Sequence, residues 1–368
     1  MFRKIVFALF ILFISFSLIA QPAQKLWSVD CILFSRINEL YKLASLAPPS
    51  TAGPWTTNEL SQMVAFVYEN KPLDSEAFNN LYRLVQEELN QESRFSVTNE
   101  VKINTSLEYN FELYAHSNTN DFTEEEDWNY GWIERAPILK IPLQISFSDI
   151  FASQVDIVAM QKLLDYKNNP IGKYSKTFWT NNNLPDFFFL DLLWPYHASG
   201  VAGGDFWKVQ IGREQLSWGP GHTGNFMLTN HLPYHDHILL SLWSNKLKYT
   251  TTVIDFPSPE EMGTGTDTVA MFFAHRIEFT LFSKMRISLS ESMMYQNDVL
   301  NLRYLNPLMI YHQYFIADKS NSLLTLEFQF NPIKNFTFYG QFCMDEMQIL
   351  GESSTIPNAM GYQVGLEV

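Results

Sequence analysis

The sequence is poor in cysteine, in positive charge and in long apolar runs, and each shortage excludes a class of protein. Cys31 and Cys343 are its only cysteines and show no metal-ligand spacing, so neither a disulfide framework nor a zinc site is indicated. Acidic residues outnumber basic ones by 39 to 25, and the formal charge of −14 argues against nucleic-acid binding. After residue 20, no apolar run reaches the roughly 18 residues that a membrane-spanning helix needs.

The first twenty residues have the layout of a secretory signal peptide. Arg3 and Lys4 precede the apolar run 5–20, and cleavage after Ala20 fits, although Leu18 is larger than usual at the −3 position. Cys31 is not at a cleavage site, which argues against a lipoprotein anchor. We therefore expect an exported protein from which residues 1–20 are removed.

Residues 21–92 are predicted to form a small helical segment on the periplasmic side of a membrane. Thr57 resembles an N-cap for a helix to about Glu69, and Asp74 can cap a second helix with an apolar stripe. Between residues 47 and 54, three prolines and a glycine leave no helical potential, so a stiff linker is expected there. The helices are expected to pack on the neighbouring domain and contact its short turns.

From residue 93 the hydrophobic period changes to two. In 101–115 the odd positions are mostly apolar, whereas Lys102, Glu108 and Glu112 occupy even positions. A membrane-spanning strand needs about 9–11 residues, and a strand of a soluble sandwich averages about six, so this length favours a barrel in a membrane. Short connections alternate with long ones over about twelve such strands. One of these strands is expected near 186–194 and is followed by a turn at 195–205. The predicted fold is an all-β, antiparallel transmembrane outer-membrane β-barrel over residues 93–368, with its long loops outside.

Strand parity assigns side chains to the two faces of this barrel. Polar residues on the hairpin that turns near Ser283 are expected to face inward, namely Arg276, Glu278, Arg286 and Ser288. Apolar residues on the hairpin around 332–335 are expected to face lipid, namely Leu326, Phe328, Phe336 and Phe338.

Two positions do not fit simple alternation. Arg213 has the parity of the lipid-facing Ile211, and a bulge at Gly212 would turn it inward. Pro142 lies within the strand 137–147 and cannot donate to the ladder, which requires a bulge or irregular pairing.

The loop that follows Ile211 is the main candidate for a binding site. Five residues are expected to fix its backbone: Gly212, Gly219, Pro220, Gly221 and Gly224. A shaped loop that carries Arg, Trp and His is typical of binding, and sugars are bound by aromatic faces together with amide, acidic and guanidinium groups. The candidate polysaccharide-binding residues are Arg213, Trp218, His222, Asn225, Arg276 and Glu278. An ordinary hairpin turn has the same glycine and proline content, so a structural role stays open.

Other chemistry has weaker support in the sequence. His231, His235, Asp236 and His237 form a cluster, but Pro233 leaves its geometry undefined, and we predict neither a metal nor another cofactor. No pair of acids stands out as a candidate for glycoside cleavage, so an enzyme is the weaker hypothesis.

Several segments resemble the Wzi family of outer-membrane capsule-assembly proteins, as it occurs in Bacteroidetes and spirochaetes. The most specific segment combines Gln210-Ile-Gly-Arg213, Ser217-Trp-Gly-Pro-Gly221 and Gly224-Asn-Phe-Met-Leu-Thr229. Further matching segments are Ala274-His-Arg-Ile-Glu278, Tyr304-Leu-Asn-Pro307, and Tyr339-Gly-Gln-Phe342 with Asp345. The resemblance covers roughly 50–368 with several gaps.

This resemblance implies an eighteen-stranded outer-membrane barrel preceded by periplasmic helices. It also implies a lectin-like, non-enzymatic protein that attaches or organises capsular or surface polysaccharide. Its expected partners are that polysaccharide and outer-membrane lipid, with a monomer as the working expectation. The last strand, 361–368, lacks the terminal aromatic typical of such barrels, so a shortened barrel and a fragment both stay open. A porin or sugar channel, which would have an open pore, and a surface glycan hydrolase are the alternative functions.

Overall fold

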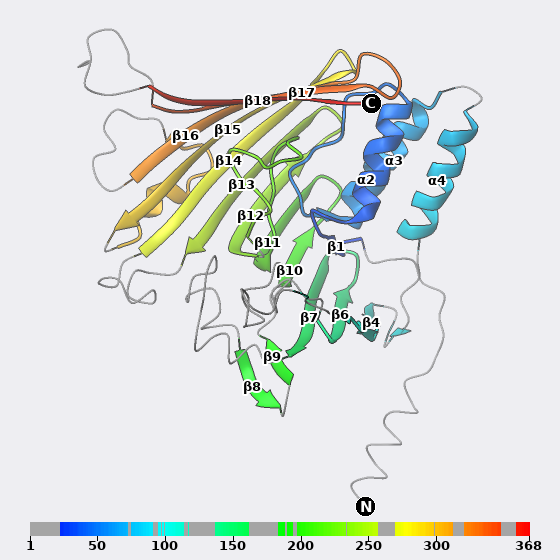
Figure 1. Cartoon of the computed structure of the whole chain (residues 1–368), viewed down its shortest axis with the longest axis vertical. Helices are drawn as coiled ribbons and strands as arrows, with labels where there is room; N and C mark the ends of the chain where they lie inside the picture. The colour runs from blue at the N-terminus through cyan, green and yellow to red at the C-terminus, as the bar shows by residue number, and fades with distance from the viewer. Residues whose placement is uncertain are drawn as a thin grey trace, which may run out of the picture.

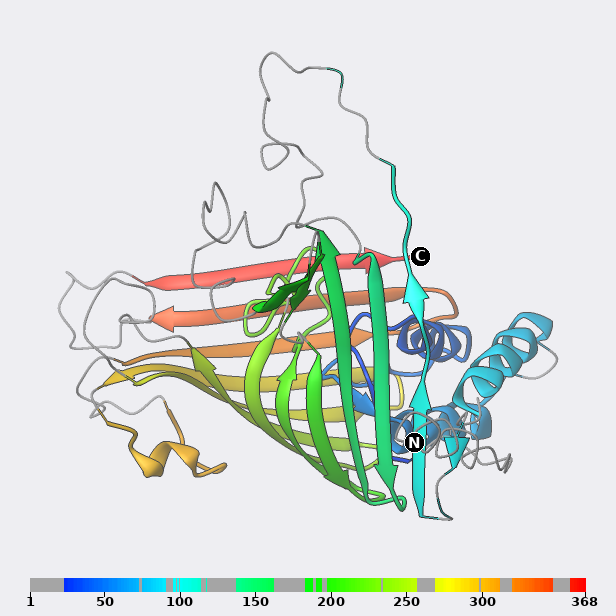
Figure 2. The same cartoon turned by 90° about the horizontal axis from the view of Figure 1, so that it is seen from below.

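The computed structural model describes most of the chain as one curved antiparallel sheet with helices at one end (Figures 1 and 2). The described residues are 23–72, 75–90, 100–113, 137–161, 183–187, 190–193, 197–232, 234–256, 269–297, 299–311, 320–346 and 358–368, with 95, 96, 98 and 117. The predicted signal peptide, residues 1–20, lies outside them.

The sheet follows the order β18-β17-β16-β15-β14-β13-β12-β11-β10-β7-β6-β4-β3, with β5 on β6 and the short β8–β9 pair on β7. Its strands are β3 (Phe95–Ser96), β4 (Val101–Thr105), β5 (Glu108–Tyr109), β6 (Leu139–Phe147), β7 (Phe151–Gln161), β8 (Asn183–Phe187), β9 (Leu190–Leu193), β10 (Ala198–Gly203), β11 (Trp207–Glu214), β12 (His235–Trp243), β13 (Leu247–Phe256), β14 (Val269–Leu281), β15 (Met285–Asn297), β16 (Ser320–Phe330), β17 (Thr337–Glu346) and β18 (Ala359–Glu367). From β10 to β18 consecutive strands pair antiparallel, and β7 pairs with β10, which confirms the predicted all-β, antiparallel, barrel-like architecture of the outer-membrane type. In Figure 2 the sheet curls around the blue N-terminal segment.

The two faces of the sheet differ as strand parity predicts. On β16, Thr325 and Glu327 are buried inside, whereas Leu326 is 47% exposed on the outer face. Phe338 of β17 is 39% exposed on the same outer face, whereas Gln341, on the inner face of β17, is buried. The predicted outward orientation is therefore confirmed, and the barrel has an apolar outside and a polar inside.

Two predicted strands have different bounds. The strand expected at 101–115 is divided into β4 and β5, and its ladder with β6 lapses at residues 106–107. Pro142 lies opposite this gap, where its missing N–H leaves no partner unpaired, while its register with β7 is regular. The strand expected at 186–194 is divided between β8 and β9, which pair with each other. The turn predicted at 195–205 is wrong, because 198–203 form β10 and the chain reverses at 204–206.

The bulge predicted at Gly212 is also wrong. The pairing of β11 with β12 runs without a register shift from Trp207 to Glu214, and Arg213 lies opposite Asp236 on the outer face. Gly212 adopts φ 139°, and a Cβ there would lie 2.3 Å from the Ala198 carbonyl oxygen. Glycine is needed here for close backbone approach within a regular ladder.

Three helices pack together beside the short turns: α2 (Ile32–Leu43), α3 (Thr57–Glu69) and α4 (Glu76–Leu89) (Figure 1). Thr56 and Ser75 cap α3 and α4, each one residue from the expected position. Apolar residues of all three helices form a core with side chains fully buried, among them Leu33, Ile37, Leu40, Leu60, Val64, Phe78 and Val85. None of the helices in the described residues is long and apolar enough to cross a bilayer.

The predicted contact of the helices with the short turns is confirmed for α3. Asn58 Nδ2 donates to the Gly204 carbonyl oxygen (2.9 Å), and Trp243 Nε1 donates to Gln62 Oε1 (3.1 Å). Before the helices, the two-residue strands β1 (Leu26–Trp27) and β2 (Trp55–Thr56) pair with each other. Lys25 stacks on Trp27, and burial lowers the pKa of Lys25 to about 8 although the Glu88 carboxylate opposes this shift.

Residues 299–311 cover part of the outer wall. They include the 3-10 helix η2 (Leu302–Leu305), and Tyr304 and Tyr311 bury Phe273 of β14 together with Met293 and Tyr295 of β15. Leu302 and Leu308 remain exposed on this cover, at 70% and 81%. The Tyr304–Pro307 segment therefore acts by covering the outer face of β14 and β15.

Candidate functional site

A segment between α2 and α3, residues 46–55, crosses the interior of the barrel at its helical end and is called the strap here. Four side chains of the barrel donate hydrogen bonds to its carbonyl oxygens: Lys208 to Pro54, Lys248 to Ala52 (2.7 Å), Arg286 to Pro48 (2.7 Å) and Asn331 to Leu46 (2.6 Å). The strap thus crosses successive hairpins in reverse order of sequence. The segment that was expected to be a stiff linker therefore lies inside the barrel and is hydrogen-bonded to its wall.

A buried carboxylate joins the strap to two lysines. Glu59, in the first turn of α3, lies 2.6 Å from Lys248 Nζ and 3.4 Å from Lys208 Nζ, and all three side chains are at most 3% exposed. Buried charges are stable only when they are paired and hydrogen-bonded, so the lysines need both Glu59 and the strap carbonyls.

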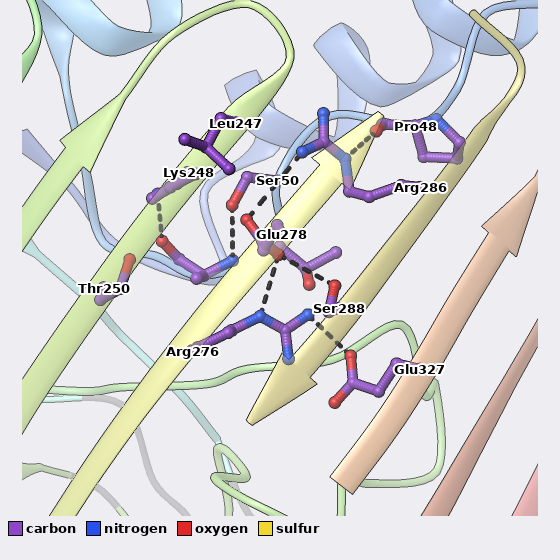
Figure 3. Close-up of polar contacts among 12 residues, drawn as sticks. Pro48, Ser50, Leu247, Lys248, Thr250, Arg276, Glu278, Arg286, Ser288 and Glu327 are labelled. Carbon is purple, nitrogen blue, oxygen red and sulfur yellow. Dashed lines mark hydrogen bonds and ion pairs between the residues drawn. The ribbon is translucent and has the colours of Figure 1, made fainter. Parts of the chain in front are cut away.

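A second ion cluster lies farther along the interior (Figure 3). Arg276 donates to Glu278 Oε1 (2.9 Å), to Glu327 Oε2 (2.7 Å) and to Ser290 Oγ (3.1 Å). Arg286 approaches Glu278 to 4.0 Å while it holds Pro48 of the strap. Arg276 and Glu278 point inward as predicted, but both are at most 1% exposed and are paired with one another. They stabilise the interior, and in this arrangement a polymer outside cannot reach them.

The loop between β11 and β12, residues 215–234, folds into the barrel from the opposite end. Trp218 is fully buried in a cluster with Leu216, Met227 and Leu228 of the loop and Ala52 of the strap. Trp218 also forms an isolated antiparallel bridge with Leu228. The Gly219 N–H donates to Thr51 Oγ1 of the strap (3.2 Å). Loop and strap therefore meet inside the barrel and fill the interior together.

The predicted loop-shaping residues occupy tight positions. Gly219 and Gly224 have φ of 128° and 125°, and Pro220 is buried. A Cβ on Gly219 would lie 2.3 Å from Asn225 Oδ1, and one on Gly221 would lie 2.1 Å from the Gly224 carbonyl oxygen. Side chains larger than hydrogen would displace the backbone here.

Asn225 shapes the same loop from within. Its Oδ1 accepts from the Gly221 N–H (2.8 Å) and from Gln341 Nε2 (2.9 Å), and its Nδ2 donates to Ser217 Oγ (3.2 Å). Asn225 therefore links the turn to β17 and is only partly accessible. His222 lies at the surface, with a side chain 65% exposed, where it pairs with Glu367 and packs edge-on against Tyr339.

Arg213 lies on the outer rim beside the loop. Its guanidinium donates to both carboxylate oxygens of Asp236 (2.8 and 2.7 Å) and lies 4.1 Å from the centre of the Tyr234 ring. Asp236 remains 43% exposed. The rim therefore presents an aromatic ring, a fixed guanidinium and an accessible carboxylate, which are groups that can meet sugar hydroxyls and ring faces.

The neighbouring histidines do not converge. His235 and His237 point into the barrel and are buried, Asp236 points outward, and His231 is exposed in the loop. His235 Nδ1 accepts from the Leu216 N–H (3.1 Å), which gives it a structural role. Within the described part of the chain, no group of three or more His, Cys, Asp or Glu is placed to hold a metal ion.

Of the predicted site residues, the structure therefore leaves His222 exposed on the loop surface and Arg213 partly buried at the rim. Trp218, Arg276 and Glu278 lie in the interior, and Asn225 supports the turn. Sequence reasoning missed the strap, Glu59 and the rim partners Tyr234 and Asp236. One signal was present: Lys208, Lys248 and Arg286 are each the second residue of alternate strands and face inward.

This architecture has a counterpart among solved structures. No family model matches the sequence, and no curated protein sequence matches it. Among solved structures, the chain resembles Wzi of Escherichia coli, described as an outer-membrane protein involved in group 1 capsule assembly and as a carbohydrate-binding β-barrel. The fold is similar to that of Wzi. The TM-score is 0.56 at 12% identity, over 93% of this chain and 67% of Wzi. The NanC porin is a more distant match, with a TM-score of 0.29 at 9% identity, over 62% of this chain and 92% of the porin.

Proposed function

We propose that the protein is a member of the Wzi family that lies in the outer membrane, binds capsular or surface polysaccharide, and helps to attach or organise it at the cell surface without enzymatic chemistry. The Wzi-like fold supports both the outer-membrane location and polysaccharide as the class of ligand. In this proposal the helices α2–α4 are periplasmic, following a cleaved signal peptide, and the loop between β11 and β12 is extracellular.

One observation favours binding over conduction. The strap and the loop enter the barrel from opposite ends and meet where Gly219 contacts Thr51, with Trp218 buried between them. An open pore would instead have its loops folded away from the lumen. We therefore expect no stepwise conductance when the purified protein is inserted into planar lipid bilayers.

We assign the direct polysaccharide contacts to the rim. Tyr234 can pack against a sugar ring, Asp236 can accept hydrogen bonds from hydroxyls, and Arg213 holds both groups in place and can meet acidic sugars. His222 does not belong to this surface, because its partner Glu367 also pairs with Lys42 of α2, at the helical end of the barrel. Repeated weak contacts along a polymer would give firm retention by multivalency.

Buried residues have a supporting role in this proposal. Trp218 and Asn225 hold the loop in shape, and Arg276 and Glu278 stabilise the wall beneath the strap. Their substitution is expected to lower stability, whereas substitution at the rim is expected to lower binding.

The test is to compare the rim variant Arg213→Ala with Trp218→Ala, measuring cell-bound and shed polysaccharide for each. The rim variant should reach the membrane and shed polysaccharide. Trp218→Ala should unfold at lower urea, because truncation of a buried Trp costs about 3–5 kcal/mol. Full retention by a folded rim variant would place the site elsewhere. Release of fragments from labelled polysaccharide by purified protein would indicate a hydrolase instead.

A further inference from the structure

A separate cavity lies in the interior, away from the loop and from the Arg276 cluster. It has a volume of about 530 Å³ and lies between residues 25–31 and the inward faces of β4, β6, β7 and β11. Small-molecule sites typically occupy about 300–1,000 Å³, so this volume is large enough for a ligand.

Four of the charged groups that line the cavity form two pairs, and Lys25, Asp30 and Glu108 also line it. Lys140 Nζ lies 2.9 Å from Asp156 Oδ2, and His197 Nδ1 lies 2.6 Å from Glu214 Oε1. Gln154 Nε2 also lies 3.4 Å from Glu214 Oε2. An entering ligand therefore meets fixed pairs and amides. Because the groups outside these pairs are two acids and one lysine, the lining gives no strong attraction for an anion.

One side chain that lines the cavity has an amide group without a hydrogen-bond partner among the described residues. Gln144 is 8% exposed, and its Nε2 has no hydrogen-bond partner among the described residues. An unpaired buried amide costs about 1–3 kcal/mol, and a ligand oxygen would remove this cost. Asn104, Thr105 and Ser106 provide further donors and acceptors on the same wall.

We propose that this cavity binds one or two residues of a neutral saccharide. Hydroxyl groups both donate and accept, which matches a wall of amides, hydroxyls and paired carboxylates, and the Gln144 amide donates to a ligand oxygen. The site is distinct from the rim, and the inference rests on the proposed function for the class of its ligand.

The experiment uses the full chain purified in lauryldimethylamine oxide, whose head group is not a sugar. Isothermal titration calorimetry is run with glucose, galactose, lactose, maltose and cellobiose, and with glucuronic acid as an anionic comparison. Neutral sugars should bind, and Gln144→Leu should weaken the tightest of them about five- to tenfold, as expected for the loss of about 1 kcal/mol.

Gln210→Leu is the matched control. Gln210 is also inward-facing, fully buried and without a partner for its amide within the described structure, but it does not line the cavity. Because each substitution removes an unsatisfied amide, both variants should fold. The proposal is overturned if none of the neutral sugars binds, if glucuronic acid binds best, or if the two variants weaken binding equally.

These outcomes are separable from those at the rim. If the rim variant loses polysaccharide while no neutral sugar binds the parent, the proposed function stands and the cavity site is refuted. If sugars bind in a Gln144-dependent way while the rim variant retains polysaccharide, the cavity site stands and the rim assignment fails.

Discussion

Replacing Glu59 by glutamine removes the carboxylate that pairs with two buried lysines. At separations of 2.6 and 3.4 Å, and an effective dielectric constant of about 20, its attractions to Lys248 and Lys208 are about 6 and 5 kcal/mol before desolvation is counted. Desolvation of all three groups offsets most of this attraction. The variant, however, keeps the desolvation cost of the lysines and loses the attraction, so we expect a net loss of about 3–5 kcal/mol.

The assay is urea unfolding in lipid vesicles, followed by tryptophan fluorescence. Glu69→Gln is the matched control, since it makes the same chemical change at an exposed position of the same helix. The double variant Glu59→Gln/Lys248→Met should recover at least about 1 kcal/mol, because one of the unpaired charges is removed. The reasoning is refuted if Glu59→Gln shifts the unfolding free energy no more than Glu69→Gln does.

Three further predictions concern the wall and the N-terminal segment. Leu326→Arg, on the outer face, should cost about 2–4 kcal/mol of unfolding free energy in vesicles, and a cost near zero would place that face outside the membrane. Because burial lowers the pKa of Lys25 to about 8, the folded protein binds fewer protons than the unfolded chain between pH 8 and 10.5. Stability should therefore rise with pH across this window, and Lys25→Met should flatten the rise in urea titrations; an unchanged slope would contradict the shift. Gly212→Ala should destabilise by more than about 1 kcal/mol, since its Cβ meets the Ala198 carbonyl oxygen, whereas Gly200→Ala on the neighbouring strand meets only ordinary contacts; equal urea midpoints would remove the steric argument.

The arrangement of the strands could be predicted because parity and loop length are local properties. The alternation of Leu326 with Glu327, repeated over many strands, requires one apolar and one polar face. A hairpin with a turn as short as that near Ser283 leaves only an antiparallel neighbour. Arg276 and Glu278 were predicted to face the polar interior, and the structure agrees. Both side chains are, however, buried too deeply to bind a polysaccharide.

The strap could not be predicted because its partners recognise backbone carbonyls, which every residue has. Nothing in residues 46–55 indicates that Lys248 or Arg286 will bind there. The burial of Trp218 depends in the same way on Ala52, a residue distant in sequence. Arg213 was expected to need a bulge, but its acid lies directly opposite on the next strand, so the regular register is itself the explanation.

The strap also has a consequence for how the protein folds. Its four contacts join residues that are 154, 196, 238 and 285 positions apart, each span longer than the one before. Contacts of such long range require loop closure before they stabilise anything, so they are expected to form late and slowly. A sheet that curled up first would exclude the strap, and the lysines would then be enclosed without partners. Folding must therefore hold residues 46–55 in place while the successive hairpins close around them, so that the interior is assembled together with the wall.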